Sequence, residues 1–263
     1  MIELIHIPIL LAFGILAGMM SGLLGVGGAT IFSPVIYFIL LSMGVPTETA
    51  LMTAFGTSLA SALPTVLAGA IGHSRKGNVS WRDAIIMGCI GLLFGFLGGC
   101  VATYIPTKIL TILFSILLIL TAIKLVIKLR AGNKERMPTP MAGGIGAITG
   151  FCSGLLGLGG GVVMVPLMTL FGKFSMKKAA GTSAAAIIFI TIGGIISYLI
   201  HGFIDWSIWI CLIATAVPSA IIAVKLSGKF SDLCLRRIFC VMMIVVAVYM
   251  SNILQLIPGF PSF

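Results

Sequence analysis

The stretch Ser21-Gly22-Leu23-Leu24-Gly25-Val26-Gly27-Gly28 is repeated 132 residues later as Ser153-Gly154-Leu155-Leu156-Gly157-Leu158-Gly159-Gly160, with seven of the eight positions identical. Each copy lies inside a long run of uncharged residues and is followed by a proline, Pro34 in the first copy and Pro166 in the second. Consecutive glycines destabilise a helix, and a proline kinks or starts one. Each copy therefore predicts a break between two helical segments.

A second short motif recurs in the same order as the first. Gly56-Thr57-Ser58 matches Gly181-Thr182-Ser183 at a spacing of 125 residues. The same spacing relates Gly77 and Trp81 to Gly202 and Trp206. Motifs that recur in the same order identify an internal repeat. The expected organisation is a first repeat over residues 1–130, a cytoplasmic linker over residues 131–137 and a second repeat over residues 138–263.

The composition is that of a membrane protein. Of the 263 residues, 59% are hydrophobic and only 8% are charged, whereas soluble domains carry about 25% charged residues. A transmembrane helix needs roughly 20 apolar residues, and the uncharged runs divide into about five apolar segments in each half. We therefore expect an all-α polytopic membrane protein. An ordinary soluble enzyme and a disordered chain are excluded.

The first two segments of each half are short for two complete crossings. In the second half they share the uncharged run 137–172, which has 36 residues including the glycine-rich break. Two complete spans and a turn need more than this length. These segments are therefore broken helices of reduced length, or they form a re-entrant hairpin, and the sequence leaves both alternatives open.

The basic residues indicate how the two repeats are oriented. In the first half, the loop after the third segment contains His73, Arg75, Lys76 and Arg82. The matching loop of the second half contains Asp205 and no Lys or Arg. Cytoplasmic loops carry an excess of Lys and Arg. Matching loops of opposite charge bias therefore predict inverted repeats, with both termini outside and the two repeated tryptophans at opposite interfaces.

Several other kinds of partner are not indicated. The net charge of +10 is scattered in short clusters between apolar runs, unlike the basic patch of a nucleic-acid-binding protein. The six cysteines form no CxxC pair and have no His at metal-ligand spacing, so neither a metal nor a cofactor is expected. Gly14, Gly18 and Gly22 recur every four residues, which predicts close helix packing within the chain or between copies in a homo-oligomer.

The helix breaks form the candidate binding site. A helix N-terminus carries partial positive charge and unpaired N–H donors, which bind anions. Two breaks in inverted repeats meet near the middle of the membrane in many secondary transporters. Hydroxyl groups in both motifs add donors, although such groups also bond to the preceding turn of their own helix. The predicted substrate-binding residues are Ser21, Gly25, Gly27, Gly28, Thr57, Ser58, Ser153, Gly157, Gly159, Gly160, Thr182 and Ser183.

At these residues the chain resembles the sulfite exporter TauE/SafE family, also called the 4-toluenesulfonate uptake permease family. The matching features are paired Gly-x-Gly-Gly breaks, each followed by a proline, in two related halves. The stretch 157–161 fits the family's Gly-x-Gly-Gly-Gly form, and the first copy departs from it at Ala29. The resemblance implies transport of small sulfur-containing anions, such as sulfite and sulfonates, across the bacterial inner membrane. It also implies an ion gradient, so the expected partners are the anion, a coupling ion and the lipid bilayer.

These features predict a secondary transporter that works by alternating access, and an anion channel of the same architecture is the alternative. An enzyme is not expected, because the chain has no His-Glu-x-x-His motif, no Gly-x-Ser-x-Gly motif and no intramembrane Asp pair. A purely structural subunit is disfavoured, since it has no need to expose backbone inside the membrane. No Lys, Arg, Asp or Glu lies clearly at mid-membrane, so dipoles and hydroxyls are expected to hold the anion.

Overall fold

The computed structural model describes residues 6–126 and 136–227, together with the single residues 231, 237, 240, 241, 244 and 245. These residues form nine helices, and no strand occurs among them. The expected all-helical membrane fold is confirmed. The predicted linker, apart from Arg136 and Met137, lies outside the described residues. The same holds for most of the last predicted segment, 238–263.

Five helices belong to the first half and four to the described part of the second. The first five are α1 (His6–Leu24), α2 (Ala29–Ser42), α3 (Thr47–Arg75), α4 (Trp81–Ala102) and α5 (Thr107–Val126). The next four are α6 (Thr139–Leu156), α7 (Gly161–Leu170), α8 (Met176–Ile200) and α9 (Trp206–Ser227). Six of the described helices are long and apolar enough to cross a membrane, namely α1, α3, α4, α6, α8 and α9.

The second helix of each half is the short one. Helix α2 has 14 residues and α7 has 10, so they measure about 21 Å and 15 Å, less than the roughly 30 Å hydrocarbon core. Helices α1 and α6, with 19 and 18 residues, are of spanning length. Pro34 and Pro166 lie inside α2 and α7, in their second turn, and each helix starts at the glycines before its proline.

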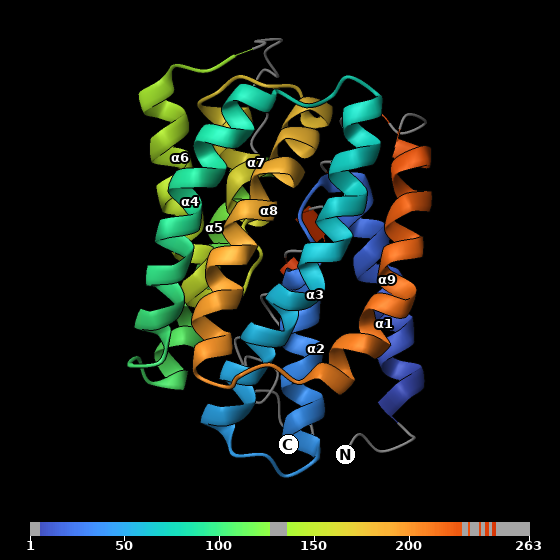
Figure 1. The fold of residues 1–263 in the computed structure, drawn as a ribbon, viewed down its shortest axis with the longest axis vertical. Coiled ribbons are helices and arrows are strands. Elements are labelled where there is room, and N and C mark those ends of the chain that lie inside the picture. The colour runs from blue at the N-terminus through green and yellow to red at the C-terminus, as the bar shows by residue number, and fades with distance from the viewer. Residues whose placement is uncertain are drawn as a thin grey trace.

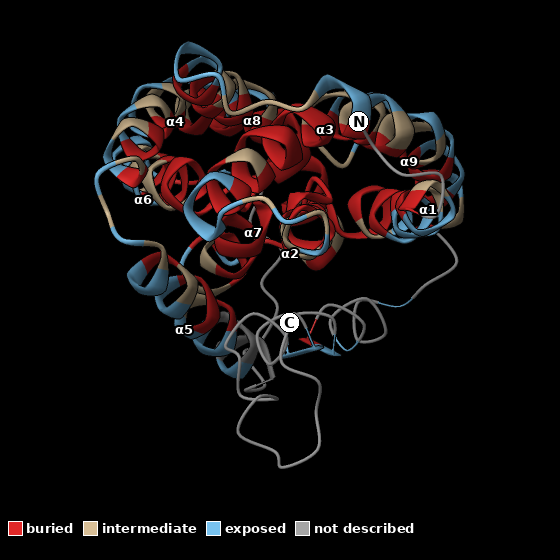
Figure 2. Ribbon diagram, turned by 90° about the horizontal axis from the view of Figure 1, so that it is seen from below, coloured by how far each residue is buried: buried red, intermediate tan, exposed pale blue. Residues whose placement is uncertain are grey.

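Helices α3 and α8 lie side by side at the centre of the bundle (Figure 1). Helix α3 runs from the lower to the upper end of the molecule, and its counterpart α8 runs the other way. The pair α1 and α9 packs on one side of this centre, and the pair α4 and α6 packs on the other. Buried residues concentrate where α2, α3, α7 and α8 meet (Figure 2).

The outer helix pairs are held close by glycines. On α1, a methyl group at Gly14, Gly18 or Gly22 would collide with the backbone of Leu212, Ala216 or Ala220 on α9. On α6, a methyl group at Gly146, Gly150 or Gly154 would collide with the backbone of Met87, Gly91 or Gly95 on α4. The four-residue spacing of these glycines therefore serves close helix packing, as expected.

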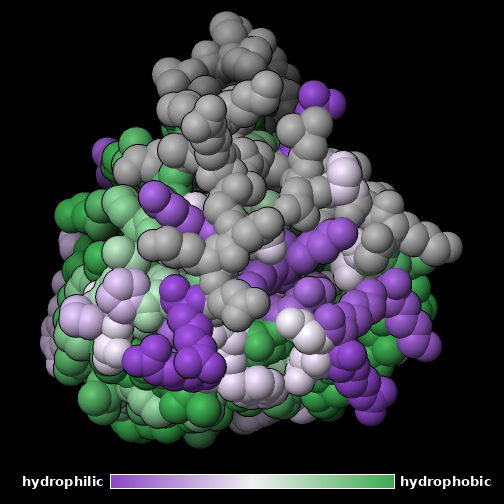
Figure 3. Space-filling model, turned by 90° about the horizontal axis from the view of Figure 1, so that it is seen from above, coloured by the Kyte–Doolittle hydropathy of each residue, from purple (hydrophilic) through white to green (hydrophobic). Residues whose placement is uncertain are grey.

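Charged residues gather at the upper end of the bundle (Figure 3). Helix ends and loops there contain Arg75, Lys76, Arg82, Lys173, Lys177, Lys178 and Lys225. The lower helix ends contain Glu48, Lys108 and Asp205. Helix α4 begins at the upper end and α9 at the lower end. Their first residues, Trp81 and Trp206, are about half exposed, which suits an aromatic ring at a membrane interface.

Candidate functional site

Both glycine motifs break the chain in the same way. Gly25, Gly27 and Gly28 have φ angles of 66°, 91° and 73°, in the left-handed region that favours glycine. Their counterparts Gly157, Gly159 and Gly160 have φ angles of 61°, 71° and 85°. These positions need glycine because an L side chain is strained at such angles. The predicted helix breaks are therefore present in the structure.

A helix begins directly after each break. The Gly28 carbonyl accepts hydrogen bonds from the N–H groups of Ile31 and Phe32, at 2.9 and 3.1 Å, which starts α2. The Gly160 carbonyl accepts from Val163 and Met164, at 3.1 and 2.9 Å, which starts α7. The N–H groups in the first turn of a helix have no intrahelical acceptor. Each break therefore presents the positive end of a helix inside the protein.

The two breaks touch each other. The Thr30 hydroxyl, in the first turn of α2, donates to the Leu158 carbonyl in the second break at 3.2 Å. A Cβ atom added to Gly159 would lie 2.8 Å from the Cβ of Ala29, and one added to Gly161 would collide with Val26. Segments more than 120 residues apart in the sequence thus come together, and with them the starts of α2 and α7.

The hydroxyls of the Gly-Thr-Ser motifs bind the opposite half of the protein. The Ser58 hydroxyl donates to the Gly157 carbonyl at 3.0 Å, and the Ser183 hydroxyl donates to the Gly25 carbonyl at 2.9 Å. The two threonines accept hydrogen bonds from loop amides. Thr57 accepts from the Asp205 N–H at 2.9 Å, and Thr182 accepts from the Ser80 N–H at 3.0 Å. Every one of these contacts has a counterpart at the repeat spacing.

These hydroxyls yield a prediction about stability. The Gly157 carbonyl accepts from two serines, Ser58 and Ser33, whereas Ser183 is the donor to the Gly25 carbonyl. A buried carbonyl that loses its partner costs about 1–3 kcal/mol. Ser183→Ala is therefore expected to lower the free energy of unfolding in detergent by that amount, and by more than Ser58→Ala does.

The matched control for both serine variants is Ser61→Ala, because the buried Ser61 hydroxyl donates within its own helix, to the Thr57 carbonyl. Denaturant titration of the purified variants measures the three free energies. Equal losses for Ser183→Ala and Ser58→Ala would contradict the unequal bonding of the two breaks.

Two further predicted residues, Ser21 and Ser153, lie in the last turn of α1 and of α6. Each is 1% exposed, and neither hydroxyl has a hydrogen-bond partner among the described residues. Thr149, which the sequence did not single out, has an unpartnered hydroxyl too, and its Cγ2 would lie 3.1 Å from a Cβ on Gly160. Unpaired buried hydroxyls are uncommon in proteins. Here they accompany both breaks.

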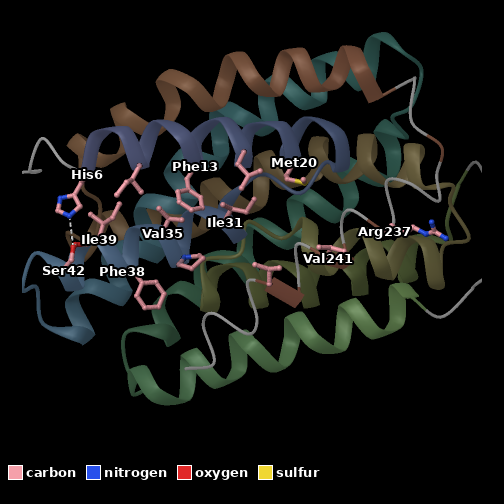
Figure 4. A pocket seen from close by; sticks show the side chains of 14 residues that line it. His6, Phe13, Met20, Ile31, Val35, Phe38, Ile39, Ser42, Arg237 and Val241 are labelled. Atoms are coloured by element: carbon pink, nitrogen blue, oxygen red, sulfur yellow. Dashed lines mark hydrogen bonds between the residues drawn. The ribbon is translucent and has the colours of Figure 1, made fainter. Parts of the chain in front are cut away.

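The candidate site is buried in the structure. All twelve predicted substrate-binding residues are buried. The large cavity in the described chain, about 860 Å³, lies beside the first break, along α1 and α2 (Figure 4). Apolar side chains such as Phe13, Val35 and Val241 form most of its wall, with His6 and Ser42 at one end and Arg237 at the other. This groove suits apolar groups better than an anion.

The burial of the His73 side chain was not predicted from the sequence. Its place at the end of an uncharged run indicates a position near a membrane interface. In the structure it is 1% exposed, and its Nε2 lies 2.9 Å from the Gly22 carbonyl in the last turn of α1. The adjoining α8 leaves room for it with Gly181, where an added Cβ would lie 3.0 Å from the His73 Cβ.

Comparison with known proteins places this architecture in a family. The family model described as Sulfite exporter TauE/SafE matches residues 10–250, which include both breaks and all nine described helices apart from the first four residues of α1. The chain belongs to the sulfite exporter TauE/SafE family. The resemblance seen in the duplicated glycine motif is thereby confirmed.

Relatives of this TauE/SafE protein are membrane transporters by name. A probable membrane transporter protein of Methanocaldococcus jannaschii is 29% identical over 94% of this chain and 96% of its own length. One from Haemophilus influenzae is 28% identical over 91% of this chain and 96% of its own length. One from Bacillus subtilis, YdhB, is 30% identical over 84% of this chain and 90% of its own length. The protein is therefore a membrane transporter of the TauE/SafE family.

Proposed function

We propose that this transporter moves small sulfur-containing anions, such as sulfite and sulfonates, across the cytoplasmic membrane as a secondary transporter. The observation that carries the proposal is the contact between the starts of α2 and α7. Two helix N-termini side by side combine their partial positive charges and their unpaired N–H groups. A small anion offsets that charge without any charged side chain, and it can also leave again.

We also propose that the two halves are inverted repeats, comprising residues 1–130 and 138–263 on either side of a cytoplasmic linker. The paired contacts support this, because a two-fold relation makes residue i of one half meet j of the other wherever j meets i. Helices α3 and α8 run in opposite directions (Figure 1), and the upper face, where the basic helix ends named above lie, is strongly hydrophilic (Figure 3). By the positive-inside rule that end is cytoplasmic and both termini are outside.

The proposed transport cycle alternates access by rocking one half against the other. In the closed arrangement, Ser58 and Ser183 bond to the carbonyls of the opposite break. When the halves separate, these hydroxyls and the first-turn N–H groups of α2 and α7 become available to the anion. The proposed anion-binding residues are those predicted from sequence, namely Ser21, Gly25, Gly27, Gly28, Thr57, Ser58, Ser153, Gly157, Gly159, Gly160, Thr182 and Ser183.

Counterflow in proteoliposomes tests the function. Vesicles preloaded with unlabelled sulfite, thiosulfate or methanesulfonate are expected to take up the labelled anion several-fold faster than empty vesicles, because a carrier exchanges substrate across the membrane. Gly159→Leu is expected to abolish this uptake, since the break cannot accommodate the side chain beside Ala29. The matched control is Gly44→Leu, which has a similar φ of 77° but open space around it.

Three results would contradict the proposal. Unchanged counterflow by folded Gly159→Leu protein would remove the second break from the mechanism. Anion conductance without stimulation by internal substrate would identify a channel. Failure of the wild-type protein to move any of the three anions would reject the substrate class.

A further inference from the structure

One pair of equivalent positions next to the breaks makes the same contact with two different side chains. His73 on α3 and Tyr198 on α8 are 125 residues apart, the spacing of the Gly-Thr-Ser repeat. His73 Nε2 lies 2.9 Å from the Gly22 carbonyl, and the Tyr198 hydroxyl donates to the Gly154 carbonyl at 2.8 Å. Both carbonyls belong to the helix turn that precedes a break. The same structural contact is therefore made by a tyrosine in one half and by an imidazole in the other.

The imidazole has a second nitrogen that the tyrosine lacks. A carbonyl only accepts hydrogen bonds, so His73 Nε2 carries the hydrogen and Nδ1 is the acceptor nitrogen of a neutral ring. Nδ1 is buried and has no hydrogen-bond partner among the described residues. Leaving a buried polar atom unpaired costs free energy. The helix contact therefore does not require a histidine, because the Tyr198 hydroxyl makes the equivalent contact with a single polar atom.

The charged groups around His73 are cationic. Gly22 of α1 and Gly181 of α8 lie against the His73 side chain. The backbone N–H of Asn78, in the following loop, donates to the His73 backbone carbonyl. The charged residues at the adjoining ends of α3, α8 and α9 are Arg75, Lys76, Lys177, Lys178 and Lys225. Lys76 bonds to the end of α9 at the Val224 and Lys225 carbonyls. The carboxylate at the start of α4, Asp83, is bonded to Ser80 and to the Met137 N–H.

A proton on Nδ1 would add a further positive charge to this cationic surrounding. Protonation is therefore unfavourable while the neighbouring break is empty, and an anion bound there offsets the added charge. By linkage, a bound anion raises the affinity of Nδ1 for a proton, and the proton raises the affinity of the break for the anion by the same factor. Histidine suits this role because its ordinary pKa, about 6.5, is close to physiological pH.

We propose that His73 Nδ1 is a proton-binding site that couples anion transport to proton movement. The proposal rests on the proposed anion transport. The Nδ1 lone pair takes a proton from water when the upper end opens, which gives an imidazolium with N–H groups on both nitrogens. The same proton returns to water when the anion is released. The Nε2–H bond to Gly22 persists in both states, so the helix contact is unchanged.

The test compares wild type with His73→Tyr, which copies the equivalent position of the other half. His73→Gln is the second variant, because its side-chain amide also donates to a carbonyl and does not titrate. Labelled methanesulfonate is the probe, since it stays ionised at every pH used. Its counterflow, and its accumulation driven by a pH gradient, are measured in proteoliposomes. The control is His201→Gln, because the His201 ring is exposed, its Nδ1 bonds to the Ser197 carbonyl one turn earlier in the chain, and the ring stacks on Phe203.

Both His73 variants are expected to retain counterflow and to lose gradient-driven accumulation, whereas His201→Gln retains both. In wild type the apparent Kd for methanesulfonate is expected to rise by up to about 10-fold per pH unit as the proton is lost, and to stay flat in the variants. A His73 variant that still accumulates the anion like wild type would overturn the proposal. Wild-type counterflow without any response to the pH gradient would also overturn it, while anion transport stands. Absence of wild-type counterflow would instead reject the proposed substrate class and the coupling with it.

Discussion

Gly25→Ala is expected to destabilise the protein far more than Gly77→Ala, although both glycines have a left-handed φ, 66° and 70°. The left-handed conformation alone costs an alanine about 1–2 kcal/mol, which is the expected loss at Gly77, where an added Cβ meets nothing within 4 Å. At Gly25 the same atom collides with the Ala180 carbonyl of the opposite half. Overpacking adds about 1–3 kcal/mol, so the expected loss at Gly25 is about 2–5 kcal/mol.

The measurement is unfolding of purified protein in mixed micelles, with the free energy of each variant taken from the same denaturant titration. Gly157→Ala provides the reciprocal case, because its Cβ would lie 2.7 Å from the Phe55 Cα, at the position equivalent to Ala180. Similar losses at Gly25 and Gly157, both larger than at Gly77, are expected. Equal losses at all three positions would show that the breaks are not packed against the opposite half as described.

The breaks were predictable because glycine carries a local signal. Three glycines within four residues disfavour a helix whatever surrounds them, and their duplication shows that the break is a fixed feature. The left-handed φ angles at Gly27 and Gly159 confirm that local expectation. The lengths of the helices were harder to predict from the sequence. The sequence left open whether the first two segments of each half are short broken helices or a re-entrant hairpin. In the structure only α2 and α7 are short, because α1 extends to Leu24 and α6 to Leu156.

The partners of the polar side chains could not be predicted, because they come from the opposite half. Bonds within their own helices were predictable, and Ser58 and Ser183 do bond to the Phe55 and Ala180 carbonyls. Their bonds to Gly157 and Gly25 depend on how α3 and α8 pack. The burial of His73 could not be predicted for a related reason. Its position near the end of an apolar segment indicates an interface, whereas the small Gly22 and Gly181 on neighbouring helices allow it to be buried.

A cross-link between α3 and α8 is expected to stop transport. A Cβ atom added to Gly69 would lie 3.8 Å from the Cβ of Ala184, which is the usual separation in a disulfide. Gly69 lies toward the upper end of α3 and Ala184 toward the upper end of α8, so the bond joins the two halves on the proposed cytoplasmic side. Oxidised Gly69→Cys, Ala184→Cys protein, made without the native cysteines, is expected to show counterflow no higher than protein-free vesicles.

The effect follows from the requirement that a carrier populate two arrangements in turn. In the proposed cycle, opening the upper end separates α3 from α8, and a disulfide would hold these helices together at the distance seen in the structure. A reductant is expected to restore counterflow. Each single-cysteine variant is expected to show the same counterflow with and without oxidant, because it has no second thiol with which to form a disulfide. The substitution at Gly69 itself is expected to be tolerated, since an added Cβ has only van der Waals neighbours at 3.8 and 3.9 Å. Full counterflow by the oxidised double variant would mean that transport does not require the halves to part at this interface, and alternating access by rocking would have to be abandoned.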